Sequence, residues 1–184
     1  MSNAFSREFL GESPTKKDQV LVFSIAILVM GVIGYFNYEQ LSAMPLWKPI
    51  LFLLMILDIV SGAVANFTKS TQLYYRNNNK RVTFLLIHFI HIGLLVLAVG
   101  HIWYCLAVLA FTLAGALIVN FTKSLQQQEI TAAVVVNLGI ILFYVVFPAP
   151  QILNWLPGIL LMKLVFGFAI NRESKSNLSS AIKD

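Results

Sequence analysis

The stretch Asp58-Ile-Val-Ser-Gly-Ala-Val-Ala-Asn-Phe-Thr-Lys-Ser70 closes a long apolar run and carries an acidic residue well inside that run. Its last five residues, Asn66 to Ser70, recur at Asn120 to Ser124 behind another apolar run. A degenerate copy of the same ending begins at Asn171. Because each copy follows an apolar run, the repeated ending predicts a chain built from repeated two-helix units.

The composition is that of a membrane protein. Of the 184 residues, 58% are hydrophobic and 11% are charged, and the mean hydropathy is +0.79. Soluble domains carry about 25% charged residues, and a helix needs about 20 apolar residues to cross a bilayer. Cys105 is the only cysteine, which excludes an internal disulfide and a cysteine-based metal site. The basic residues flank apolar segments, so the lipid bilayer is the expected partner and nucleic acid is not.

Apolar runs separated by turn residues predict six membrane-spanning helices. Asn77-Asn78-Asn79 and Pro148-Ala149-Pro150 mark two turns, and Asn154 followed by Pro157 is typical of a helix start with Asn154 as N-cap. The predicted spans are about residues 20–36, 49–65, 82–99, 104–119, 131–147 and 154–170. Residues 1–19, before this transmembrane domain, and residues 171–184, after it, are expected to form polar tails.

The spacing between the repeated endings predicts how the spans are grouped. Residues 80–120 and 130–171 each hold two spans with a short turn, and residues 18–66 follow the same plan with a longer loop. An even number of spans in each unit keeps the units parallel. We therefore predict an all-α polytopic membrane protein, in which three parallel helical-hairpin repeats form a compact six-helix bundle.

Positive charge predicts the orientation in the membrane. Of the 13 Lys and Arg residues, only Lys48 falls on one side of the six-span arrangement, Lys163 lies within a span, and the others fall on the opposite side. Basic residues concentrate on the cytoplasmic side of membrane proteins, so both termini are expected to be cytoplasmic in a multi-pass cell-membrane protein. The side that carries Lys48 also holds the aromatic residues typical of an outer interface: Tyr35, Tyr38, Trp47, Trp103, Tyr104 and Trp155.

Polar residues recur at one depth in five of the six predicted spans. Counting eight positions back from each terminal Asn gives Asp58, Thr112 and Lys163. A similar count inward from the start of the third and fifth spans gives His88 and Asn137. Eight helical residues rise roughly 12 Å, which is close to the midplane of a bilayer core of about 30 Å. The sequence therefore predicts a polar level near the middle of the membrane.

Asp58 is expected to point into the bundle. Residues 58, 61, 62 and 65 have the i, i+3, i+4, i+7 spacing of one helix face, and the last three are small. Small residues mark the faces on which membrane helices pack closely. The direction of Lys163 is left open, because its face also carries Phe166 and Ile170.

An Asp and a Lys at mid-membrane each cost about 2.5–3.5 kcal/mol to insert. The simplest compensation is an ion pair between Asp58 and Lys163, with His88 or Asn137 adding hydrogen bonds. This pair could form a functional site, or it could only fix the order of the helices.

His88 and His91 lie one helical turn apart, close in sequence depth to Asp58. We predict a substrate-binding site formed by Asp58, His88, Asn137, Lys163, Thr112 and His91. The chain has no HExxH motif, phosphate loop, nucleophile elbow or dinucleotide fingerprint, so no metal, cofactor or catalytic residue is predicted. At the helix ends, Asn66 and Asn120 are expected to cap carbonyls, and Lys69 and Lys123 to bind lipid headgroups.

Three classes of function fit these features. The first is a small transporter, or a membrane substrate-binding subunit, that holds a small polar or ionic solute at the midplane. The second is a structural or assembly protein in contact with other membrane subunits, whose Asp–Lys pair only fixes packing. The third is a lipid-modifying enzyme with Asp58 and His88 as acid and base, which ranks below the other two because clustered acids are absent.

Overall fold

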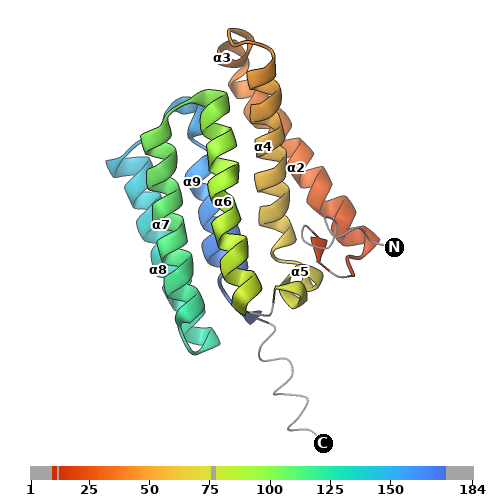
Figure 1. Ribbon diagram of the computed structural model, residues 1–184, viewed down its shortest axis with the longest axis vertical. Coiled ribbons are helices and arrows are strands. Elements are labelled where there is room, and N and C mark those ends of the chain that lie inside the picture. Colours follow the sequence, from red (N-terminus) through yellow and green to blue (C-terminus); the bar gives the residue numbers. More distant parts are fainter. Residues whose placement is uncertain (1–9, 12, 76–77, 173–184) are drawn as a thin grey trace, which may run out of the picture.

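The computed structural model describes residues 10–11, 13–75 and 78–172 (Figure 1). Within these residues every regular element is helical and none is a strand. Six helices in this part of the chain are long and apolar enough to cross a membrane: Lys16–Phe36, Trp47–Ala65, Arg81–Val99, Ile102–Phe121, Leu125–Val146 and Gln151–Phe168. The prediction of an all-helical chain with six helices able to cross a membrane is confirmed for the described residues, and this architecture is consistent with a multi-pass membrane protein.

The elements follow one another in a simple order. The first half contains α2 (Lys16–Phe36), α3 (Tyr38–Ser42), α4 (Trp47–Ala65), α5 (Lys69–Tyr74) and α6 (Asn78–Val99). The second half contains α7 (Ile102–Phe121), α8 (Leu125–Ile141), the π-helical η1 (Leu142–Val146), the 3-10 helix η2 (Gln151–Leu153), α9 (Leu156–Leu160) and the π-helical η3 (Leu161–Phe168).

The last span runs through the centre of the molecule. Its η3 segment packs against α4, α7 and α8, and 61% of this span is buried inside the protein. By contrast, α2 packs mainly on α4, and only 11% of its span is buried. In Figure 1, α4 and α6 lie side by side, with α9 behind α6. The six spans therefore differ in how much of their surface is buried against other helices. Most of the surface of α2 would face the lipid in a membrane.

The two ends of the bundle differ in what they carry. Figure 1 places the two ends of the described chain, the short helix α5 and the α7–α8 turn at one end. The opposite end carries α3 and the turn from α6 to α7. That second turn is tight because Gly100 and His101 both adopt left-handed backbone angles, with φ values of 78° and 58°. Glycine adopts this conformation without strain, which explains its position directly before His101.

The starts of two helices differ from the predicted span starts. The helix α8 begins at Leu125 rather than near residue 131, because the Ser124 side chain accepts a hydrogen bond from the Gln127 N–H and caps the helix. Pro157 lies in the first turn of α9 as predicted, but Asn154 is not the N-cap. Trp155 occupies the N-cap position, and the Asn154 carbonyl instead accepts a hydrogen bond from the Tyr144 hydroxyl.

The repeated pentapeptide takes two different local structures. In the first copy α4 ends at Ala65, and the Thr68 side chain caps the extra short helix α5. In the second copy α7 continues to Phe121, and Ser124 caps the long helix α8. The same five residues are therefore followed by a short helix in the first copy and by a long helix in the second. The segment after each copy decides where the next helix starts.

Candidate functional site

The centre of the predicted site is a contact between Asp58 of α4 and His91 of α6. The Asp58 Oδ2 and His91 Nε2 atoms lie 3.1 Å apart, and the two side chains are 29% and 22% exposed. The His91 Nδ1 atom lies 3.1 Å from the Ile87 carbonyl oxygen, one turn earlier in the same helix. The pair therefore links α4 to α6 at the edge of their interface.

His88 lies behind this pair and is almost completely buried. Its Nδ1 atom lies 2.9 Å from the Phe84 carbonyl oxygen, and its ring packs at 5.1 Å from the His91 ring. Its Nε2 atom is buried and has no hydrogen-bond partner among the described residues. A buried polar atom without a partner is uncommon in folded proteins and marks a place where a ligand or water can bind.

Lys163 of η3 is 3% exposed, so its charge lies inside the protein. The space for its ammonium group comes from Gly62 of α4, where an added Cβ would lie 2.7 Å from Lys163 Nζ. The charges of Lys163 and Asp58 attract each other, but the only ion pair within 4 Å in the described part of the chain joins Asp58 to His91. The direct partner of Asp58 is thus His91, in place of the Asp58–Lys163 pair expected from sequence.

The backbone around Lys163 is π-helical. The Ala169 N–H donates to the Leu164 carbonyl five residues earlier, at 2.9 Å. The Asn66 side-chain amide donates to the Lys163 carbonyl oxygen, also at 2.9 Å. π-Helical segments leave some carbonyls outside the regular ladder and are frequent at functional sites. Asn66 therefore holds the segment that positions Lys163.

The structure brings four of the six predicted residues together: Asp58, His88, His91 and Lys163. We refer to these four side chains as the Asp58 cluster. The other two lie outside it. The buried Thr112 hydroxyl bonds to the Val108 carbonyl oxygen, and the exposed Asn137 amide bonds to the Ala133 carbonyl oxygen. Both polar groups are satisfied within their own helices, so a shared depth in the sequence did not bring them to the site.

A second polar network ties the helix ends to η3. Its centre is Arg81, the largest fully buried side chain described, which donates to the Asn120 side-chain oxygen at 2.8 Å and to the Phe168 carbonyl. The Gln72 amide donates to the Asn66 carbonyl oxygen at 2.5 Å and to the Gly167 carbonyl oxygen at 2.8 Å. In the sequence, Arg81 reads only as one more basic residue at a span end, so hydropathy gave no signal for this role.

The side chains of the repeated asparagines join neighbouring spans. The Asn66 side chain donates to η3, and the Asn120 side chain accepts from α6. Asn66 also ends α4 as predicted, because its backbone N–H donates to the Gly62 carbonyl oxygen at 3.1 Å. Asn120 does not cap its helix, because α7 continues to Phe121. Lys69 and Lys123 are exposed near the same end of the bundle, where a lipid headgroup can reach them.

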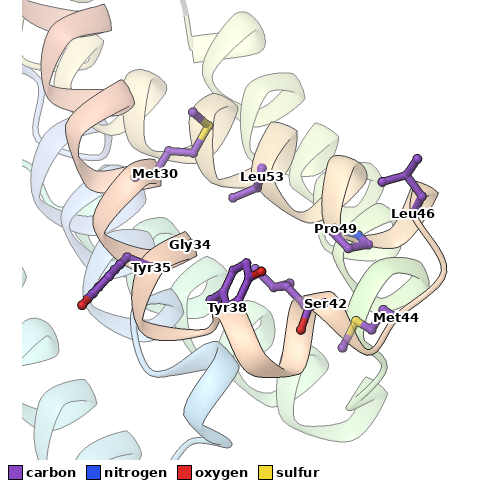
Figure 2. A pocket seen from close by; sticks show the side chains of 11 residues that line it. Met30, Gly34, Tyr35, Tyr38, Ser42, Met44, Leu46, Pro49 and Leu53 are labelled. Atoms are coloured by element: carbon purple, nitrogen blue, oxygen red, sulfur yellow. The ribbon is translucent and has the colours of Figure 1, made fainter.

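No residue of the Asp58 cluster lines the three cavities described in the structure. One of these cavities has a volume of about 670 Å³ and lies between α2, α3 and α4, at the end of the bundle that carries α3 (Figure 2). Met30, Leu53 and Met44 give it a mainly apolar wall, and Tyr35 and Tyr38 lie on its α2–α3 side. None of the six predicted site residues lines it.

The chemistry of the Asp58 cluster is that of one acid, two imidazoles and one amine in a largely dry environment. In the described part of the chain no three His, Cys, Asp or Glu side chains are placed to hold a metal ion. The cluster can exchange protons and can pair with charged groups of a solute. No protein-family model, curated protein or solved structure matches this chain.

Proposed function

We propose that this protein is a small membrane transporter, or the substrate-binding membrane subunit of one, that holds a polar or ionic solute at the Asp58 cluster. The observation that carries the proposal is Lys163, a buried amine with no carboxylate within 4 Å among the described residues. A charge at mid-membrane costs about 2.5–3.5 kcal/mol, and residues that carry this cost mark solute and ion pathways. A solute carboxylate or phosphate would offset that cost.

A purely structural role is the second candidate, and the geometry favours it less. A pair that only fixed helix order would be expected to bring Asp58 and Lys163 into contact, whereas Asp58 instead contacts His91. The partial exposure of Asp58 and His91 also leaves the cluster reachable from the surface of the bundle. A solute-binding role explains both features.

The proposed arrangement in the membrane places both termini in the cytoplasm, with the three helical hairpins as parallel repeats. Support comes from Lys69, Lys123 and Arg172, which occupy the end of the bundle where the described chain starts and finishes. Lys48 lies at the other end, with its Nζ atom 5.5 Å from the Trp47 ring centre. This separation of charge follows the distribution found in membrane proteins whose basic end faces the cytoplasm.

Single-cysteine labelling tests this orientation. In a Cys105→Ala background, Gln40→Cys and Gln126→Cys place one exposed thiol at each end of the bundle. We expect a membrane-impermeant maleimide to label Gln40→Cys on intact cells, and to label Gln126→Cys only after permeabilisation. The reverse pattern would require both termini to lie outside the cell.

Native mass spectrometry of the purified protein tests the proposed function. We expect wild-type protein to retain a small polar solute, and Asp58→Asn to lose it at least tenfold while reaching normal membrane levels. Asn137→Ala is the matched control, because Asn137 is polar and within a span but bonds only to its own helix. If Asp58→Asn and Asn137→Ala retained the solute equally, the Asp58 cluster would not be the solute-binding site. Loss of membrane protein in Asp58→Asn alone would favour the structural role.

A further inference from the structure

The contact between Asp58 and His91 requires a proton that the two side chains share. The His91 Nδ1 atom has a carbonyl oxygen as its neighbour, so this nitrogen carries a hydrogen and donates it. The other ring nitrogen, Nε2, then faces Asp58 Oδ2 at 3.1 Å. If Nε2 were bare and the carboxyl ionised, two acceptors would face each other, and Oδ2 would be a buried oxygen without a hydrogen bond.

We infer that Asp58 and His91 form a proton-binding site that holds α4 against α6. Movement of the solute is coupled to release of this proton. Coupling to a solute rests on the proposed function, whereas the shared proton follows from the contact itself. The bound state is either imidazolium with carboxylate or neutral imidazole with carboxylic acid, and both contain one proton between Nε2 and Oδ2. The shared proton thus links two neighbouring spans, α4 and α6.

Release of the proton has a direct mechanical consequence. The bond between the proton and Nε2 or Oδ2 breaks, the proton leaves to water, and both electrons of the bond stay on the atom that held it. An ionised Asp58 then faces the lone pair of a neutral His91, and the attraction across the α4–α6 interface is lost. Because one group is on each helix, proton release favours separation of the two helices at this level.

The other groups around the pair act on the shared proton in different ways. Lys163 of η3 is buried close to the pair, and its positive charge opposes a second positive charge in the cluster, which favours release of the proton. His88 presents beside His91 a buried Nε2 that has no hydrogen-bond partner among the described residues. The titratable residues of the neighbouring helices α2 and α7 lie near the helix ends. In α2 they are Lys16, Lys17 and Asp18 of the first turn and Tyr35 of the last turn, and in α7 they are Tyr104 and Cys105 of the first turn.

Nitrogen NMR of the histidine side chains tests the shared proton without any solute. The protein is labelled with 15N-histidine in lipid nanodiscs, and the His91 signals are assigned by their loss in His91→Gln. At neutral pH we expect His91 Nε2 in wild-type protein to show the shift of a protonated or proton-sharing nitrogen. In Asp58→Asn we expect Nε2 to move to the position of a bare nitrogen, because the Asn amide donates its own hydrogen to it. His101, which lies in the turn outside this level, is the internal reference and should not change.

A bare Nε2 on His91 in wild-type protein, or an unchanged His91 signal in Asp58→Asn, would overturn the proton site. Asp58→Glu keeps the acid and is expected to retain a protonated Nε2, which separates loss of the proton from misfolding. The solute measurement remains independent of this result. Retained solute with a bare Nε2 would remove this inference alone. A protonated Nε2 with no Asp58-dependent solute would remove the proposed function and, with it, the coupling.

Discussion

Replacement of Lys163 by Met is expected to stabilise the protein and to abolish retention of the solute. The Lys163 side chain is buried and makes no ion pair within 4 Å with a described residue, so its charge is poorly compensated. Replacing a buried ion pair with apolar groups of similar volume is often neutral or stabilises proteins by about 1–4 kcal/mol, and a buried charge without an ion pair has a similar desolvation cost with less attraction to offset it. For a chain of this length we expect a gain of about 2 kcal/mol, or about 4–8 °C in melting temperature. Thermal unfolding in detergent, followed by tryptophan fluorescence, measures this gain.

Lys163→Arg is the control, because it keeps the positive charge and should not stabilise the protein. A fall in melting temperature in Lys163→Met would contradict the prediction. If the double variant Asp58→Asn with Lys163→Met then recovered that loss, the two charges would be a structural pair. We expect Lys163→Met to stabilise the protein because Asp58 contacts His91 directly, and this contact remains when Lys163 is removed.

Replacement of Arg81 by Gln is expected to destabilise the protein more than any other change considered for this chain. The Arg81 guanidinium is 1% exposed and bonds to the Asn120 side-chain oxygen and to the Phe168 carbonyl, and it lies 4.9 Å from the Phe168 ring centre. Hydrogen bonds from charged donors contribute about 1.5–3 kcal/mol each, and their loss leaves two acceptors unsatisfied. We expect a loss of about 3–5 kcal/mol and a fall of about 10 °C in melting temperature.

Arg172→Gln is the matched control for this prediction. Arg172 also donates to carbonyls at the end of η3, with its Nη2 atom 3.0 Å from the Phe166 oxygen, but it is only partly buried. Water can replace its bonds, so we expect less than half the effect of Arg81→Gln. Arg81→Lys should fall between the two, since one ammonium cannot reproduce the fork of a guanidinium. Equal effects for Arg81 and Arg172 would show that burial of Arg81 adds nothing to its contribution.

Much of the fold could be read from the sequence because hydropathy is a local property. An apolar run of sufficient length forms a spanning helix whichever neighbours it meets. For the same reason the six spans, the turn at Gly100 and His101, and the mid-span depth of Asp58 follow from the chain alone. The errors are at helix starts, where side-chain caps such as Ser124 carry a helix beyond the apolar run.

The candidate site was only partly predictable, because depth along a span does not specify which way a side chain points. Asp58, His88, His91 and Lys163 come together, whereas Asn137 has a similar depth and faces outward. A small polar side chain on the outer face can bond to its own helix backbone, so polarity alone does not place it inside.

What the sequence by itself determined is the class of protein: an all-helical chain with six helices able to cross a membrane, and with charged groups placed inside two of them. Only the tertiary structure decided the partners of those charges. His88 and His91 are three residues apart and differ by only about 60° around their helix, so either could meet Asp58. The packing of α6 on α4 places His91 against the carboxylate and His88 behind it, and the central position of η3 buries Lys163 beside them. Contacts between helices depend on the rotation of each helix about its own axis and on the angle at which two helices cross. A local sequence pattern specifies neither of these.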